Sequence, residues 1–193
     1  GYGSGTPEGN GVNCYPTCEY VFFTQECSSD EACIPTRGTD WFDGGRYQQY
    51  QRHNWDANNT GILSIWRYNF TGVSKVNAII YQVDKSGLTD EAKNKVKAEL
   101  RSLRAYYYYN LLDCFGNVPI STDFTEKVLP TNSTRKEVFE FIEKELKEIM
   151  PLLPSGVTYG RFTQNVANTL LARLYLNAEV YTGSPRWQDC LDA

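Results

Sequence analysis

The sequence is poor in the residues that build metal centres and nucleophilic sites. His53 is the only histidine among 193 residues, and no two of the six cysteines are spaced as Cys-x-x-Cys. Structural zinc sites use cysteine and histidine ligands at short spacings, and a catalytic cysteine needs a histidine beside it. We therefore expect no zinc site, no Cys–His nucleophile and no cofactor.

Long apolar segments and basic clusters are also missing. No apolar run approaches the roughly 20 residues that a membrane-spanning helix needs. The net charge is −4, and lysine and arginine are scattered among acidic residues, which argues against a nucleic-acid-binding protein. The chain starts at Gly1 without a start methionine, signal peptide or lipidation cysteine, so we expect a processed or trimmed end.

Carboxylate pairs suited to catalysis do not stand out either. A glycoside hydrolase needs two carboxylates that face each other across a cleft. Glu143 and Glu145 sit among lysines on a predicted helix, which is the pattern of ordinary surface charge. With no nucleophile–base pair visible, we expect a protein that is not an enzyme.

Aromatic residues are abundant, and they centre on one predicted helix. Four consecutive tyrosines, Tyr106–Tyr109, span all sides of one turn, so neighbouring elements must cover this helix on at least two sides. Leu100, Leu103, Tyr107 and Leu111 are spaced to line one face of it. Gly116 is suited to the C-terminal cap, and Pro119 cannot continue the helix.

Apolar residues recur with helical spacing in four segments. These segments predict helices over residues 60–83, 92–113, 135–149 and 163–182. Thr134 with Glu137 fits a capping box, Thr163 fits an N-cap, and Gly183 fits a helix end. The segment 187–193 resembles the first turn of a further helix. Residues 14–35 read as the end of a first helix, although a strand fits the same pattern.

The predicted fold class is all-α. Antiparallel helix pairs in a tetratricopeptide-like solenoid account for the four stripes, with long irregular segments between them. Residues 1–13 are glycine-rich and are expected to form a loop. Residues 36–61 and 116–133 are the other irregular segments, and the first of these is the one we expect to contact a ligand or partner.

Four of the six cysteines fall within the first 33 residues. Disulfides within this group would indicate an oxidising compartment. The alternative is that some of them are free, buried thiols that behave as small apolar residues. The sequence leaves both readings open for the full set: Cys14, Cys18, Cys27, Cys33, Cys114 and Cys190.

Several segments resemble the SusD/RagB family, in order and with similar spacing. The resemblance extends over nearly all of residues 20–193, and the segments that carry it are Ser29–Gly45, Arg52–Trp55, Glu99–Pro119, Thr134–Pro154 and Tyr159–Ala178. The resemblance implies a lipid-anchored, surface-exposed outer-membrane protein of Bacteroidetes. Such proteins capture glycans, or sometimes peptides, beside a TonB-dependent SusC-like transporter. Residues 1–193 would then be the N-terminal helical part of a single SusD-like domain, truncated at the C-terminus.

The resemblance also implies where a glycan would bind. In starch-binding members, an aromatic residue and a nearby amide from the loop matching Arg52–Asn59 help to form the sugar platform. This implies Trp55 and Asn58 as glycan-binding residues, with His53 beside them. An indole ring can cover the C–H face of a pyranose, and an amide can both donate to and accept from sugar hydroxyls. The alternative is that Trp55 only packs the loop onto the helices.

The segment from Asp30 to Arg46 is the predicted contact surface for the transporter. It is long, irregular and punctuated by glycine, and Trp41, Phe42 and Arg46 are residue types enriched at interfaces. The alternative is that these aromatic residues fold back and are buried. Four acidic residues in the segment offer oxygen ligands for Ca²⁺ but lack the EF-hand order, so we expect a solvated loop. They are Asp30, Glu31, Asp40 and Asp43.

The expected function is therefore cell-surface glycan binding with delivery to a TonB-dependent transporter. The alternative is a tetratricopeptide-type interaction scaffold without direct ligand binding. A scaffold explains the helices but leaves the 29–55 segment unexplained. The sequence does not indicate which glycan is bound.

Overall fold

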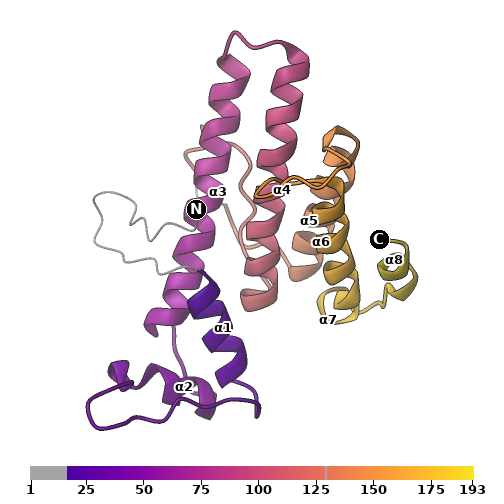
Figure 1. Ribbon diagram of the computed structural model, residues 1–193. Coiled ribbons are helices and arrows are strands. Elements are labelled where there is room, and N and C mark those ends of the chain that lie inside the picture. Colours follow the sequence, from indigo (N-terminus) through magenta and orange to yellow (C-terminus); the bar gives the residue numbers. More distant parts are fainter. Residues whose placement is uncertain (1–16, 129) are drawn as a thin grey trace. The chain divides into compact units, whose positions relative to one another are not determined.

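The computed structural model describes residues 17–128 and 130–193, with side chains from Tyr20 onward, and the predicted loop over 1–13 lies outside them. The described residues are helical and contain no strand beyond two isolated bridges, Arg37–Asp40 and Pro119–Asn132, so the all-α prediction is confirmed. The α-helices in Figure 1 are α1 Thr17–Cys27, α2 Arg46–Arg52, α3 Thr60–Lys85, α4 Asp90–Phe115, α5 Arg135–Ile149, α6 Gln164–Leu176, α7 Ala178–Thr182 and α8 Trp187–Asp192. Two short 3₁₀ turns, η1 Asp43–Gly45 and η2 Met150–Leu152, complete the set.

Three of the four predicted helices are confirmed to within a few residues, as α3, α4 and α5. The fourth prediction, a single helix over 163–182, is wrong, because it is two helices that meet at Asn177. The backbone of Asn177 leaves the helical region at φ −101° and ψ 12°. Residues 14–35 contain helix α1, which excludes the strand alternative, and the segment 187–193 begins a helix as expected.

The predicted caps are present. The Thr134 hydroxyl accepts a hydrogen bond from the backbone of Glu137, whose carboxylate accepts one in return, which completes the capping box of α5. Thr163 caps α6 by accepting from the backbone of Val166. Gly116 and Gly183 follow α4 and α7 with φ of 68° and 79°, a region in which glycine carries no steric penalty.

The chain divides into two compact units, and the boundary falls inside α3. The first unit comprises residues 1–70 and, in its described part, holds α1, η1, α2 and the first turns of α3. The second unit comprises residues 71–193 and holds the rest of α3 and α4 to α8. None of the described helices is both long enough and apolar enough to span a membrane.

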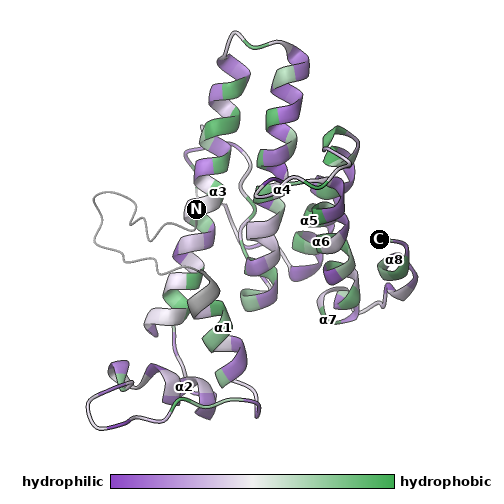
Figure 2. Cartoon of the chain, viewed as in Figure 1, coloured by the Kyte–Doolittle hydropathy of each residue, from purple (hydrophilic) through white to green (hydrophobic). Residues whose placement is uncertain are grey.

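Neighbouring helices of the second unit run antiparallel (Figure 1). Lys97 pairs with Asp84 across α4 and α3, while the ring of Tyr108 on α4 meets that of Phe141 on α5 at 5.0 Å. Gly72 allows α3 to approach α4, because a Cβ atom there would lie 2.4 Å from the Tyr107 ring. Both α3 and α4 show hydrophilic and hydrophobic segments along their length (Figure 2). The antiparallel run of these helices agrees with the helix pairs predicted from the sequence.

The four tyrosines of α4 are all at least partly covered, as expected for an inner helix. Tyr108 and Tyr109 are buried, and Tyr106 and Tyr107 are half-buried. The predicted stripe is only partly right, since Leu111 is buried but Leu100, Leu103 and Tyr107 are not. The deepest positions of α4 also include two polar side chains: Ser102 donates to the Ala98 carbonyl of the same helix, and Arg104 belongs to a charged network that links α4 to α5.

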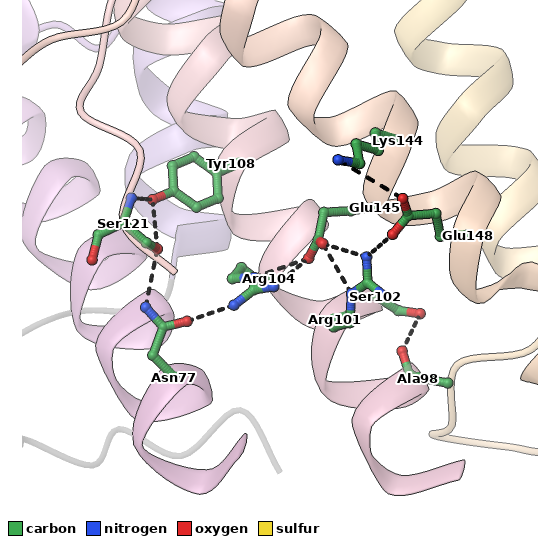
Figure 3. Close-up of polar contacts among 10 residues, drawn as sticks. All are labelled: Asn77, Ala98, Arg101, Ser102, Arg104, Tyr108, Ser121, Lys144, Glu145 and Glu148. Atoms are coloured by element: carbon green, nitrogen blue, oxygen red, sulfur yellow. Dashed lines mark hydrogen bonds and ion pairs between the residues drawn. The ribbon is translucent and has the colours of Figure 1, made fainter. Parts of the chain in front are cut away.

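The centre of this network is the carboxylate of Glu145 on α5 (Figure 3). Arg104 donates to its Oε2 atom from Nε at 3.0 Å and from a terminal nitrogen at 2.7 Å. Arg101 donates to Oε1 at 2.9 and 2.6 Å and also reaches Glu148. Glu145 and Arg104 are both buried, so the prediction that Glu145 is ordinary surface charge is wrong. Its partners lie more than 40 residues away in the sequence, where local charge patterns give no sign of them.

The network extends from Arg104 to the connection between α4 and α5. Arg104 donates to the side-chain oxygen of Asn77 on α3 at 2.8 Å, and the Asn77 amide donates to the Ser121 carbonyl at 3.0 Å. The Ser121 N–H in turn donates to the Tyr108 hydroxyl at 2.8 Å (Figure 3). One chain of polar contacts therefore holds three helices and the 116–134 connection together.

We expect Glu145→Gln to destabilise the protein strongly. The substitution keeps the side-chain shape but leaves the buried Arg104 charge without its counter-ion, which costs about 3 kcal/mol or more. Glu148→Gln is the matched control, because this carboxylate is half exposed and such pairs contribute less than about 1 kcal/mol. Urea unfolding of both variants measures the difference, and equal losses would contradict a special role for Glu145.

Candidate functional site

Aromatic side chains gather in the first unit around helices α1 and α2. Tyr47 and Tyr50 of α2 and Cys27 of α1 are buried together, and three apolar side chains pack against them: Phe23, Ile34 and Ile62. We call the connected rings of this unit the aromatic cluster: Phe22, Phe23, Trp41, Tyr47, Tyr50, His53 and Trp55.

The rings of the aromatic cluster form a continuous series of contacts. Tyr47 lies in its middle, with Trp41 on one side at 5.9 Å between ring centroids and Tyr50 on the other at 6.2 Å. Trp55 continues the series from Tyr50 at 6.4 Å, and His53 lies 5.5 Å from Trp55. Most of these rings meet edge to face or tilted, the arrangements that aromatic quadrupoles favour. Both tryptophans of the aromatic cluster therefore contact a buried tyrosine, Trp41 at Tyr47 and Trp55 at Tyr50.

Asn59 holds the side chain of the buried Tyr50 in place, although no sequence pattern used above singled it out. The Tyr50 hydroxyl donates to Asn59 Oδ1 at 3.0 Å, and the same oxygen accepts from the backbone of Gly61 and Ile62, so Asn59 caps α3. The Asn59 amide donates to Gln49 at 2.6 Å. Burial raises the pKa of Tyr50, which keeps this hydroxyl protonated as a donor.

Gly61 makes this contact possible. A Cβ atom at Gly61 would lie 1.9 Å from the Tyr50 hydroxyl oxygen, so only glycine fits beneath it. Asn59 directly precedes Thr60, the first residue of α3, and asparagine at that position is a common N-cap; this local signal could have identified it.

The segment that precedes α2 has an unusual backbone. Arg37 and Asp40 exchange two backbone hydrogen bonds of 3.0 Å around Gly38, whose φ is +63°. Trp41 and Asp43 then adopt φ of +61° and +42°, which is uncommon for residues other than glycine and strained for a bulky one. Strained backbone of this kind concentrates at binding sites, which makes this turn a candidate for function.

Arg46 lies inside the unit rather than on its surface. Its guanidinium stacks over the rings of Tyr47 at 4.7 Å and Tyr20 at 5.3 Å and donates to the Tyr47 hydroxyl at 2.7 Å. It also lies 3.9 Å from Asp43, and its side chain is only 15% exposed. These contacts make Arg46 a support of the strained turn, where the sequence analysis expected an interface residue.

Of the residues predicted to bind glycan, the structure brings Trp55 and His53 together. Trp55 is 36% exposed, so it both packs against Tyr50 and presents part of its indole to solvent. His53 ends α2 in the left-handed region at φ +53°. Asn58 is exposed; its backbone donates to Asp56, and its side chain makes no hydrogen bond with the residues that the structure describes.

Two of the residues predicted to contact a partner are exposed. Trp41 is 49% exposed even though its ring contacts Phe23 and Tyr47, and Phe42 next to it is exposed to a similar degree.

The acidic side chains of the same segment do not come together around one point. No three histidine, cysteine, aspartate or glutamate side chains come close enough to hold a metal ion in the described part of the chain.

Four cysteine side chains are described, and all four are free thiols. Cys27 is buried in the aromatic cluster's core, Cys33 is exposed, and Cys114 and Cys190 are half-buried. A disulfide between Cys27 and Cys33 is therefore absent from the structure. Cys14 and the side chain of Cys18 lie outside the described residues, where the expectation of a disulfide stays a prediction.

Comparison with known proteins places this architecture in a family. A family model described as SusD-like, starch-binding and associating with the outer membrane matches residues 27–176. The chain belongs to the SusD-like family. Residues 27–176 contain all rings of the aromatic cluster except Phe22 and Phe23, together with α3 to α6, so the family match extends into both compact units.

Individual relatives agree with this assignment. The starch-binding protein SusD of Bacteroides thetaiotaomicron is 38% identical over 123 residues, which cover 61% of this chain and 22% of SusD. A SusD-like protein of Bacteroides ovatus is 26% identical, over 88% of this chain and 35% of its own length. A solved laminarin-binding SusD-like protein superposes with a TM-score of 0.69 at 22% identity, over 95% of this chain and 42% of its own.

The SusD-like chain described here therefore spans about a fifth to a third of the length of these curated relatives. At 22% identity, the likeness to the laminarin-binding protein bears on the fold, which it shares along almost the whole chain. The shared fold agrees with the tetratricopeptide-like helix pairs predicted from the sequence.

Thiol reactivity gives a direct test of the cysteine environments. We expect iodoacetamide at pH 8 to modify Cys33 quickly and Cys27 slowly, because Cys27 is buried and burial, with the nearby Cys33, raises its thiol pKa. Cys114 should also react slowly, since burial raises its pKa to about 12. Peptide mass mapping over time separates the sites, and rapid modification of Cys27 would contradict the packing described above.

Proposed function

We propose that this chain is the helical part of a cell-surface glycan-binding protein that is anchored to the outer membrane by lipid and delivers its ligand to a TonB-dependent, SusC-like transporter. The observation that supports this proposal best is the half-exposed indole of Trp55, held in place by the buried Tyr50 and Asn59. The family description, starch-binding and outer-membrane association, points to the same class of ligand and location.

Trp55 has the physical properties that a sugar platform needs. A pyranose ring presents a face of C–H groups, and an indole offers a flat apolar surface of matching size. A side chain held at a fixed orientation loses little conformational freedom on binding, so more of the contact energy appears as affinity. The contact with Tyr50 and the Tyr50–Asn59 hydrogen bond supply that fixed orientation.

His53 and Asn58 supply polar groups in the same loop. The His53 ring lies beside Trp55, and imidazole nitrogens can donate to or accept from sugar hydroxyls. The exposed Asn58 side chain offers one acceptor and two donors. In the proposed site, the Trp55 ring stacks on a sugar ring while His53 and Asn58 form hydrogen bonds with its hydroxyl groups.

The protein is proposed to bind rather than to cleave its ligand. Glu143, one of the helical carboxylates considered for catalysis, accepts hydrogen bonds from Lys147, Tyr175 and Arg186. Burial opposes its ionisation, but these bonds outweigh burial and hold the pKa of Glu143 below its usual value. A general acid of a glycosidase needs the opposite shift. Both carboxylate oxygens of Glu145 likewise accept hydrogen bonds from arginines, Arg101 and Arg104.

Trp41 and Phe42 form the proposed contact surface for the transporter. They are large, half-exposed aromatic residues on a strained turn, and such residues are enriched at the centres of interfaces. Arg46, which the sequence analysis grouped with them, acts in this proposal by holding the turn in place through Tyr47 and Tyr20.

We expect Trp55→Ala to weaken glycan binding without lowering the melting temperature. Loss of one stacking contact should cost about 1–2 kcal/mol, which corresponds to a roughly tenfold fall in affinity. Affinity electrophoresis of the full-length protein in starch and laminarin gels measures retention, and a thermal melt of the same sample measures folding.

Trp187→Ala is the matched control for this test. Trp187 is also half exposed, but it belongs to α8 of the second unit and should leave retention unchanged. A Trp55 variant that melts early, yet binds normally where folded, would show that the indole only packs the loop. Retention of neither polysaccharide by the unmodified protein would favour an interaction scaffold instead.

We expect the double variant Trp41→Ala, Phe42→Ala to lose co-purification with the outer-membrane transporter while it keeps its glycan retention. Truncating two aromatic anchors typically costs about 2–4 kcal/mol at an interface, enough to lower complex yield more than tenfold. Arg46→Glu would not serve here, because placing a carboxylate among Tyr20, Tyr47 and Asp43 would unfold the turn. Unchanged co-purification of the folded double variant would place the interface elsewhere.

A further inference from the structure

A second exposed aromatic surface lies in the second unit, on the connection between α4 and α5. Phe124 is 54% exposed, and its ring contacts that of Tyr81 on α3 at 5.8 Å with an angle of 46° between the ring planes. We call this pair the Tyr81–Phe124 platform. A single exposed apolar side chain is common on protein surfaces, but here two rings pack together on a loop whose base is held by hydrogen bonds.

The loop that carries Phe124 is ordered at its base. The Ser133 N–H donates to the Val118 carbonyl at 3.0 Å, and Val118 itself is fully buried. Ser121 is held from both sides, because its N–H donates to Tyr108 and its carbonyl accepts from Asn77. The loop therefore leaves and rejoins the helices at fixed points.

A local turn then fixes Phe124 itself. The Asp123 carboxylate accepts from the backbone N–H and from the hydroxyl of Thr125, both at 2.7 Å, and so closes a turn around the intervening residue. The Lys85 ammonium donates a hydrogen bond to the Tyr81 hydroxyl and holds this ring from one turn further along α3. The exposed Phe124 ring therefore packs on the ring of Tyr81, which Lys85 holds in place.

We propose that the Tyr81–Phe124 platform is a second glycan-contacting surface, which takes a neutral polysaccharide chain. The ligand class follows from the chemistry of the platform. An exposed phenyl face matches the C–H face of a pyranose, and the half-buried Tyr81 ring in contact with it helps to hold that face in place. The charged groups beside the rings, Lys85 and Asp123, have opposite signs, which favours a neutral ligand over a charged one.

This inference rests on the proposed function for its ligand class, but it concerns different residues. The site at Trp55 is in the first unit, whereas the platform is built from α3 and from the α4–α5 connection of the second. Each surface consists of its own residues, so a substitution in one leaves the other intact and the contribution of each to retention can be measured separately.

The test is affinity electrophoresis of the full-length protein in gels that contain soluble starch, laminarin or xyloglucan. Phe124→Ala should lower the affinity for the polysaccharide that retains the unmodified protein by about fivefold, the loss expected for one aromatic contact. Phe124→Trp should keep or increase retention, because it restores a larger flat face. Val128→Ala is the matched control, since Val128 is a 75% exposed apolar residue of the same loop without a ring, and its retention should not change.

The outcomes separate the two sites. Normal retention of Phe124→Ala together with weak retention of Trp55→Ala would overturn the platform and leave the proposed function standing. Weak retention of Phe124→Ala with normal retention of Trp55→Ala would support the platform and move the main site away from Trp55. A fall in melting temperature for Phe124→Ala that Phe124→Trp reverses, with no change in retention, would make the ring structural and overturn the proposal. Failure of all three polysaccharides to retain the unmodified protein would overturn both.

Discussion

The second unit depends on the compensation of one buried negative charge. Glu145 is removed from water, and an isolated carboxylate in that position would cost several kcal/mol. Two arginines from α4 satisfy both of its oxygens, and because their forks must meet the carboxylate in one geometry, they fix how α4 lies against α5. Through Asn77 and Ser121 the same constraint reaches α3 and the 116–134 connection, so the base of the loop that carries Phe124 is determined by the charge network.

In the first unit, aromatic packing and a neutral hydrogen bond fix the positions of the helices in place of a charge network. Its described core is built from aromatic rings, and its key polar contact is neutral, the hydrogen bond between Tyr50 and Asn59. A buried tyrosine requires a partner for its hydroxyl, and Asn59 meets that requirement while it also caps α3. One side chain thus sets both where the long helix begins and where Tyr50 lies, and Tyr50 in turn sets the orientation of Trp55. The close approach at Gly61 is part of the same arrangement.

Features with local causes could be predicted from the sequence, and features with distant causes could not. The capping box at Thr134 and the N-cap at Thr163 depend on residues three positions apart, so helix starts were predictable. The burial of Glu145 depends on Arg101 and Arg104, 44 and 41 residues away, and the lysines beside it suggested a surface position instead. The break at Asn177 lies within a continuous apolar stripe, which outweighed the one local sign of a helix end, the asparagine itself. At the candidate site, His53 and Trp55 are neighbours in the sequence and were found together, but the inward position of Arg46 requires Tyr20 from another helix.

The two candidate binding surfaces share a construction. In each, an exposed aromatic ring rests on a tyrosine that the helices hold in place: Trp55 on Tyr50, and Phe124 on Tyr81. A free aromatic side chain on a mobile loop would lose conformational entropy on binding and would tend to collapse onto the nearest apolar surface. A supporting tyrosine reduces both costs, because it fills the space into which the ring would collapse and leaves the outer face in water. The surplus of tyrosine in this chain, 14 among 193 residues, therefore serves the helical scaffold and the presentation of its exposed rings alike.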